Sequence, residues 1–210
     1  MRFCAVERLG YIEMRTGEIN RKTSETDVRV SLNLDGVGKS SIDTGIGFLD
    51  HMLELFARHG RFDLEIKCDG DTHVDNHHSV EDVGICLGTA LAEAVGDGRG
   101  IFRYCDVTLP MDEALVLCAL DFSGRSSLNL DVTLPDRAVG TMDTELFEEF
   151  MSAFVRKAGI TVHIKMLAGK NAHHILEACF KALARSLRGA VKIDPEAIDE
   201  IPSTKGTLVL

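Results

Sequence analysis

Four of the eight histidines in this 210-residue chain lie in two His-His-x-x-Glu segments, residues 77–81 and residues 173–177. On a helix, the first histidine and the glutamate of such a segment lie about 40° apart on one face. The second histidine points roughly 100° away from the first. One helix can therefore offer a His/Glu pair to one metal ion and a single histidine to another.

The two segments belong to an internal repeat. A shift of 98 residues places residues 50–67 over residues 148–165, and a shift of 96 places the first His-His-x-x-Glu segment over the second. The tetrapeptide SLNL at residues 31–34 recurs at residues 127–130, again at a shift of 96. Because these matches are collinear, they indicate an ancient duplication.

The repeat predicts two matched metal sites. In each, the His/Glu pair of one half is joined by the second histidine of the other half and by the residue at position 51 or 149. The predicted ligands of one metal are His77, Glu81, Glu149 and His174, and those of the other are His51, His78, His173 and Glu177. Imidazole-rich sites with carboxylates suit Mn, Fe, Co, Ni or Zn rather than Mg or Ca. One such segment alone is typical of exposed polar residues on a helix, but two copies in register favour metal binding.

Alternating apolar and polar residues predict the strands that position these segments. Strict alternation, typical of strands with one buried face, covers residues 28–34, 62–68, 128–134 and 160–166. Residues 115–122 are almost wholly apolar and predict a more central strand. Gly36 and Gly38 predict a hairpin turn that leads to a second strand near residues 39–43.

Helical patterns follow the strands in each half. They cover about residues 47–59, 77–95, 143–157 and 172–189, and the glycines that are expected to end them are Gly60, Gly96, Gly159 and Gly189. The predicted order within each half is therefore strands, helix, strand, helix. Two such halves predict an internally duplicated α+β fold, with helices packed on the apolar faces of the sheets.

The composition limits the classes of protein. With 45% hydrophobic and 27% charged residues, the sequence is typical of a soluble globular protein. A net charge of −10 argues against nucleic acid or an anionic membrane surface as the main partner. The longest apolar run, residues 114–120, is far shorter than the ~20 residues of a membrane span. The N-terminus lacks a signal-peptide pattern and the six cysteines lack C-x-x-C spacing, so a reduced, cytoplasmic protein is expected.

From about residue 15 to its C-terminus, the sequence resembles the imidazoleglycerol-phosphate dehydratases, enzymes of histidine biosynthesis. The motifs that carry the resemblance are RKTSET (21–26), GFLDHM (47–52), DNHHSVED (75–82), GR (124–125), AGKNAHH (168–174) and PSTKG (202–206). The resemblance implies a duplicated fold of the ribosomal protein S5 domain 2-like type. We expect a first half at residues 15–106, and a second half at residues 107–210 that ends in a substrate-binding tail. Residues 1–14 are an N-terminal extension of unknown role.

The resemblance implies dehydration of D-erythro-imidazoleglycerol phosphate to imidazoleacetol phosphate. The reaction must remove a proton from a carbon that no carbonyl group activates. Two Mn²⁺ or similar ions per active site, one on each ring nitrogen, would favour the imidazolate. The electron-rich ring can expel hydroxide and give a diazafulvene-like intermediate, from which a carboxylate takes the C–H proton. The resulting enol tautomerises to the ketone.

The family also implies roles for residues outside the repeat motifs. Glu25 matches the acid/base glutamate, which contacts substrate, and Glu177 is the next candidate for the catalytic base. The residues that match the phosphate-binding positions are Arg103, Arg125, Lys181, Ser203 and Lys205. On the sequence alone, Glu25 would be the exposed end of a strand, and the basic residues would be ordinary surface residues.

Family resemblance further implies self-association into trimers and a 24-subunit shell with metal sites between subunits. Spacing alone does not distinguish ligands of one subunit from ligands of two. Some relatives carry histidine where this sequence has Glu149. Because the repeat places Glu149 opposite His51, we expect Glu149 to be a ligand.

Two other functions fit part of the pattern. A two-metal phosphoesterase would also place paired sites near basic residues, but such sites usually rely on bridging carboxylates, whereas five of the eight ligands predicted here are histidines. A metal-storage shell of the ferritin type needs a four-helix bundle, which the strand patterns contradict.

Overall fold

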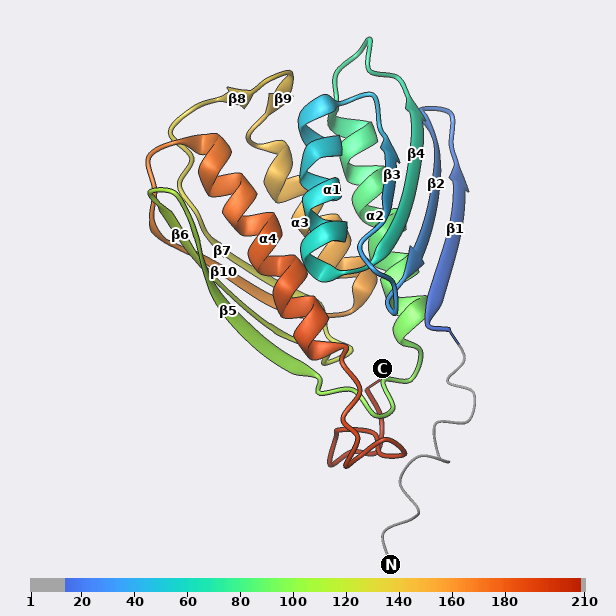
Figure 1. Cartoon of the computed structure of the whole chain (residues 1–210). Coiled ribbons are helices and arrows are strands. Elements are labelled where there is room, and N and C mark those ends of the chain that lie inside the picture. Colours follow the sequence, from blue (N-terminus) through green and yellow to red (C-terminus); the bar gives the residue numbers. More distant parts are fainter. Residues whose placement is uncertain (1–13, 209–210) are drawn as a thin grey trace, which may run out of the picture.

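Residues 14–208 are described by the computed structural model, in which four helices lie between two four-stranded sheets (Figure 1). Apart from Met14, the predicted N-terminal extension falls outside the described residues. In the described part, none of the helices is long and apolar enough to cross a membrane.

The first sheet comes from the first half of the sequence. Its strand order is β1-β2-β4-β3, where β1, β2 and β4 pair antiparallel and β3 runs parallel to β4. The elements of this half are β1 (Thr16–Lys22), β2 (Thr26–Asn33), β3 (Ser40–Asp43), α1 (Gly47–Gly60), β4 (Asp63–Gly70) and α2 (His77–Val95). Val28, Val30 and Leu32 alternate along β2 and are buried, as expected for a strand with one face on the core.

The second sheet repeats this topology. Its order is β5-β6-β10-β7, where β5, β6 and β10 pair antiparallel and β7 runs parallel to β10. The elements of this half are β5 (Tyr104–Met111), β6 (Ala114–Asp121), β7 (Ser127–Asp131), β8 (Ala138–Val139), β9 (Met142–Asp143), α3 (Leu146–Ala158), β10 (Thr161–Ala168) and α4 (Ala172–Ala190). The short hairpin β8-β9 has no counterpart among the described elements of the first half. The duplicated α+β fold is therefore confirmed, and the expected division at residues 106 and 107 lies within β5.

Each helix pair in the middle layer combines one helix from each half. α2 packs on β1 and β2 and against α3, while α4 packs on β5 and β6 and against α1 (Figure 1). A Cβ atom at Gly88 of α2 would lie 2.4 Å from the carbonyl oxygen of Phe154 in α3, so the close approach of these helices requires glycine there. The pairing of α1 with α4 brings residues from distant parts of the sequence together.

Two details of the sequence prediction are wrong. The turn at Gly36 and Gly38 does not close a hairpin, because β3 pairs with β4 rather than with β2. Instead, Asp63 at the start of β4 accepts the backbone N–H groups of Val37, Gly38 and Lys39, which fixes the turn beside β4. Gly189 does not end its helix either, since α4 continues through Ala190.

Candidate functional site

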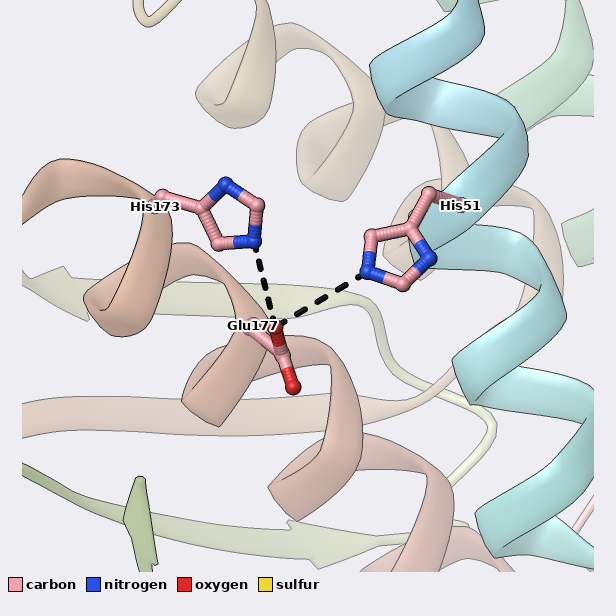
Figure 2. A group of neighbouring side chains, drawn as sticks. All are labelled: His51, His173 and Glu177. Atoms are coloured by element: carbon pink, nitrogen blue, oxygen red, sulfur yellow. Dashed lines mark hydrogen bonds and ion pairs between the residues drawn. The ribbon is translucent and has the colours of Figure 1, made fainter. Parts of the chain in front are cut away.

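His51, His173 and Glu177 form a group where α1 meets the start of α4 (Figure 2). The Oε2 atom of Glu177 lies 3.2 Å from Nε2 of His173 and 3.8 Å from Nε2 of His51. The three ligand atoms all lie within 4.8 Å of one another. The side chain of Asn171 caps α4 by accepting the backbone N–H groups of His173 and His174, which fixes the first turn of the helix.

Glu177 is the most buried member of this group, with a side chain that is 8% exposed. Burial alone raises the pKa of its carboxyl, but the hydrogen bond and charge of Lys181 and the neighbouring His51 and His173 outweigh burial and lower that pKa. Lys181 contacts Oε1 of Glu177, so Oε2 remains turned toward the two imidazole rings. The edge of Phe48 packs against the ring of His173, with centroids 5.1 Å apart.

The chemistry of this donor set fits a divalent transition metal. Two imidazole nitrogens and one carboxylate oxygen converge, and these are the ligand types that Mn, Fe, Co, Ni and Zn accept. Three protein ligands leave coordination positions for a further ligand and for substrate. Among residues 14–208, no other set of three His, Cys, Asp or Glu side chains brings its ligand atoms within 4.8 Å of one another.

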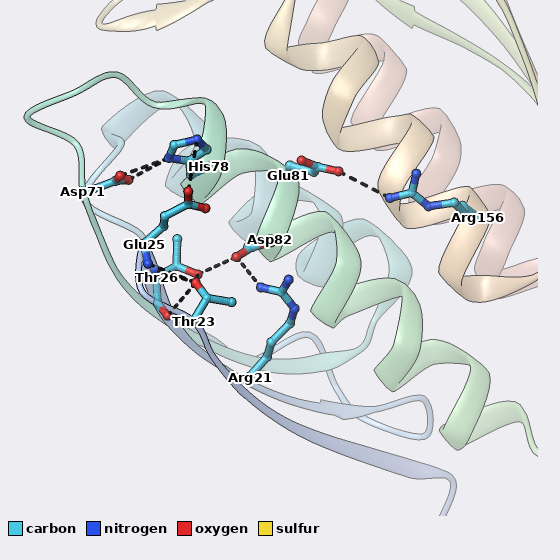
Figure 3. Close-up of polar contacts among 9 residues, drawn as sticks. All are labelled: Arg21, Thr23, Glu25, Thr26, Asp71, His78, Glu81, Asp82 and Arg156. Carbon is cyan, nitrogen blue, oxygen red and sulfur yellow. Dashed lines mark hydrogen bonds and ion pairs between the residues drawn. The ribbon is translucent and has the colours of Figure 1, made fainter.

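His78 does not belong to this group within one subunit. It lies at the start of α2, where its Nδ1 is 3.0 Å from Oδ2 of Asp71 and its Nε2 is 3.9 Å from Oε1 of Glu25 (Figure 3). The hydrogen bond to Asp71 raises the pKa of the His78 ring. The predicted set of His51, His78, His173 and Glu177 is therefore only partly assembled by a single subunit.

Glu25 projects from the turn between β1 and β2. The Thr23 hydroxyl accepts the backbone N–H groups of Glu25 and Thr26, and Thr26 in turn donates to Asp82. Arg21 also binds Asp82, so this network lies beneath the turn and fixes it to α2 (Figure 3). Glu25 itself is exposed, and its carboxylate faces His78.

The counterpart of the first group is not assembled. His77 and Glu81 lie on α2 and Glu149 lies on the adjacent α3, yet they form no such group among the described residues. Instead, Arg156 of α3 donates to Oε1 of Glu81 over 3.3 Å (Figure 3). Glu149 is half-buried, on the helix where the repeat predicts it.

His174, the second histidine of α4, is held by the turn between β5 and β6. Its Nδ1 lies 2.7 Å from Oε2 of Glu113, and its Nε2 lies 3.7 Å from Oδ2 of Asp112. The hydrogen bond from His174 is the main cause that lowers the pKa of Glu113 to about 2. The sequence analysis did not identify Asp71 or Glu113. Asp71 precedes the first His-His pair in the sequence by six residues, but Glu113 is 61 residues from His174, so the sequence carried no signal that joins the two.

Two of the predicted phosphate-binding residues lie at different points along α4. Lys181 lies at the middle of the helix, one turn after Glu177, whereas Arg103 donates its backbone N–H to the carbonyl of Ala190 at the C-terminal end. At a rise of about 1.5 Å per residue, Glu177 and Ala190 are roughly 20 Å apart along the helix axis. The His51 group and the backbone of Arg103 therefore lie far apart along α4.

Arg103 is tied to the C-terminal segment. Its guanidinium donates to Asp121 over 2.7 and 3.3 Å and to the carbonyl of Pro202 over 2.7 Å. The next residue is Ser203, whose hydroxyl accepts the backbone N–H of Lys205. Arg125 lies in the turn after β6, where its backbone bonds to the Ser123 hydroxyl. The structure thus brings Arg103 and Ser203 near one another, and leaves Lys181 apart from them at the middle of α4.

Comparison with known proteins gives one consistent family. The family model described as imidazoleglycerol-phosphate dehydratase matches residues 44–187. Proteins of that name from Methylobacterium radiotolerans and Xanthobacter autotrophicus are 57% and 60% identical over 195 residues, which make up 93% of this chain and 100% and 99% of those proteins. Crystal structures of the dehydratases from Staphylococcus aureus and, in complex with (S)-C348, from Pyrococcus furiosus are each 40% identical with a TM-score of 0.78. The matches cover 85% and 91% of this chain and 99% and 100% of those structures.

Proposed function

Because the chain belongs to the imidazoleglycerol-phosphate dehydratase family, hydro-lyases of histidine biosynthesis, we propose that it converts D-erythro-imidazoleglycerol phosphate to imidazoleacetol phosphate with the aid of divalent metal ions. The observation that carries the metal dependence is the convergence of His51, His173 and Glu177 on one point. We further propose two metal ions per active site, with Mn²⁺ as the ion, and a cytoplasmic location.

Eight residues hold the two metals in this proposal. They are His51, His77, His78, Glu81, Glu149, His173, His174 and Glu177. Divalent ions held by these residues would supply Lewis-acid stabilisation of the ionised imidazole ring of the substrate. The carboxylates among the ligands offset part of the added positive charge.

Glu25 is the base that removes the carbon-bound proton of the substrate. The threonine and aspartate network beneath its turn fixes the backbone, while the exposed carboxylate remains free to reach substrate. Its carboxylate lies 3.9 Å from Nε2 of His78, so the base and a predicted metal ligand are neighbours. Glu177 is the alternative base, although its contact with Lys181 favours a ligand role.

The phosphate group of the substrate binds to Arg103, Arg125, Lys181, Ser203 and Lys205. Charge-assisted hydrogen bonds from guanidinium and ammonium groups suit a dianion. Two subunits contribute these groups in this proposal, because Arg103 lies beside Ala190 at the end of α4, roughly 20 Å along the helix axis from Glu177 of the His51 group.

Self-association into trimers and a 24-mer accounts for the incomplete sites of a single subunit. His78 lies apart from the His51 group, and His77, Glu81 and Glu149 form no group of their own among the described residues. In the assembly, His78 of one subunit completes the His51 group of another, and His174 completes the site at His77 in the same way.

The test is a direct assay of purified protein with imidazoleglycerol phosphate and Mn²⁺. We expect the ketone product, detected by NMR, and no release of inorganic phosphate. Phosphate release without ketone would favour a two-metal phosphoesterase. Absence of the ketone with every divalent metal would contradict the proposed reaction, and metal uptake far above two ions per subunit would favour storage.

A further inference from the structure

His78 and His174 share a mode of support that the other predicted histidine ligands lack among residues 14–208. Each is the second histidine of a His-His pair, and each has a carboxylate against its Nδ1. The carboxylate oxygens of Asp71 lie 3.0 and 3.2 Å from Nδ1 of His78, and Oε2 of Glu113 lies 2.7 Å from Nδ1 of His174. The Nε2 atoms lie farther from any carboxylate, 3.9 Å from Oε1 of Glu25 for His78 and 3.7 Å from Oδ2 of Asp112 for His174.

The two carboxylates come from different elements, so the shared arrangement is not a simple copy of one loop. Asp71 follows β4, and its backbone N–H donates to the carbonyl of Glu25 over 3.1 Å. Glu113 lies between β5 and β6, and its Oε1 accepts the backbone N–H groups of Lys170 and Asn171. The carboxylate of Glu113 is thus held by backbone N–H groups, whereas Asp71 is held through its own backbone.

We propose that Asp71 and Glu113 are positioning residues that hold the proton of His78 and His174 on Nδ1 and present Nε2 to a metal ion. A carboxylate accepts hydrogen bonds only, so a neutral imidazole beside it must donate from Nδ1. The other nitrogen then carries the lone pair that a metal requires. The inference rests on the proposed function, because it assigns these residues to the metal ligands.

Glu113→Gln is the decisive variant. The two backbone N–H groups that bind Oε1 hold the amide oxygen of the new side chain on their side, which places its NH₂ group against Nδ1 of His174. An amide NH₂ donates, so Nδ1 must accept and the proton moves to Nε2, where it blocks metal binding. No backbone N–H among residues 14–208 orients the Asp71 carboxylate, so the corresponding variant at His78 is Asp71→Ala, which removes the acceptor beside Nδ1.

Matched controls are Asp106→Asn and Asp69→Asn, which remove exposed carboxylates from β5 and β4 without touching either ring. Nitrogen-15 NMR of histidine-labelled, metal-free protein at alkaline pH reads the tautomer directly. We expect the Nδ1–H form of His174 in wild type and in Asp106→Asn, and the Nε2–H form in Glu113→Gln. Calorimetric titration with Mn²⁺ should show affinity weakened about 10–100-fold in Glu113→Gln.

An unchanged His174 tautomer in Glu113→Gln, with Mn²⁺ affinity within twofold of Asp106→Asn, would overturn the proposal. If Glu113→Gln does not fold, Asp71→Ala decides in its place: His78 should lose its preference for the Nδ1–H form, and an unchanged preference would overturn the proposal. The tautomer is read without metal or substrate, so a wild-type protein that lacks dehydratase activity would contradict the proposed function and leave this readout intact.

Discussion

His51 and Glu177 come from opposite halves of the sequence, yet Nε2 of the one lies 3.8 Å from Oε2 of the other. The internal duplication explains this contact, because α1 of the first half packs against α4 of the second. The same packing of α2 on α3 places Glu149 on the helix next to His77 and Glu81. The duplicated fold therefore brings residues of both halves together in two regions, and only the region of His51, His173 and Glu177 forms a compact group among the described residues.

Glu25→Gln separates proton transfer from metal binding. The amide keeps the shape of the residue but cannot accept the substrate proton, so kcat should fall ~10²–10⁴-fold. Metal content, measured by elemental analysis, should stay the same. Glu18→Gln, on the exposed face of β1, is the control and should retain activity. A much smaller loss in Glu25→Gln would point to another base, with Glu177 next in line.

Glu149→Ala tests whether the glutamate at this position binds metal. If Glu149 is a ligand, the variant should bind fewer ions per subunit or bind one of two ions more weakly, as measured by Mn²⁺ titration. Glu148→Ala removes the adjacent, exposed carboxylate and should change neither value. Two ions of full affinity in Glu149→Ala would reduce Glu149 to a helix surface residue.

Metal removal tests whether the sites lie between subunits. Chelation should shift the particle to a smaller species, and added Mn²⁺ should restore the larger one, as followed by light scattering. His78→Asn should imitate the chelator, since it removes a ligand at the start of α2 without breaking the helix. A particle mass that stays constant under both treatments would place each site within one subunit.

The pair of Glu113 and His174 predicts a pH window of stability in the metal-free protein. The pKa of Glu113 is lowered from 4.5 to about 2. The stability that its charged form adds to the folded protein is therefore complete above the unfolded pKa of 4.5 and is lost as the pH falls through the folded pKa of about 2. The pKa of His174 is raised, so its contribution is present below the unfolded value of about 6.5 and is lost as pH rises through the folded value.

The difference in Tm between wild type and Glu113→Gln should therefore be largest between about pH 4.5 and 6.5. It should shrink on the acid side, where Glu113 becomes protonated, and again on the alkaline side, where His174 loses its proton. Asp106→Asn supplies the control curve. A Tm difference that is independent of pH would show that the pair does not act through charge.

The periodicity of apolar residues predicted most of the fold, because the apolar residues that recur in the sequence are the ones that face the core. β2, β4 and β10 have the alternating burial that their sequences predict, and β6 is a central strand as expected. The edge strand β1 went unpredicted because Ile19 is its one large apolar residue, and a polar edge strand carries little pattern. β5 alternates in Cys105, Val107, Leu109 and Met111, but these residues are only partly buried and the pattern was missed.

The histidines and glutamates of the candidate site could be predicted because the internal repeat aligns them. The repeat aligned His51 with Glu149 and the two His-His pairs with each other, and the structure brings His51, His173 and Glu177 together. It gave no information on the carboxylates that support His78 and His174, because Asp71 and Glu113 lie in a loop and a turn that occupy different places in the two halves. Nor does spacing within one sequence show whether the ligands come from one copy of the chain or from two.

Mn²⁺ titration of the metal-free protein, followed by ketone formation, tests the central claim most directly. We expect no ketone without metal, activity that rises with added Mn²⁺, and a plateau at two ions per subunit. Chelation at the plateau should abolish product formation. Ketone formation at full rate by the metal-free protein, or none at any Mn²⁺ concentration, would contradict a metal-dependent dehydration.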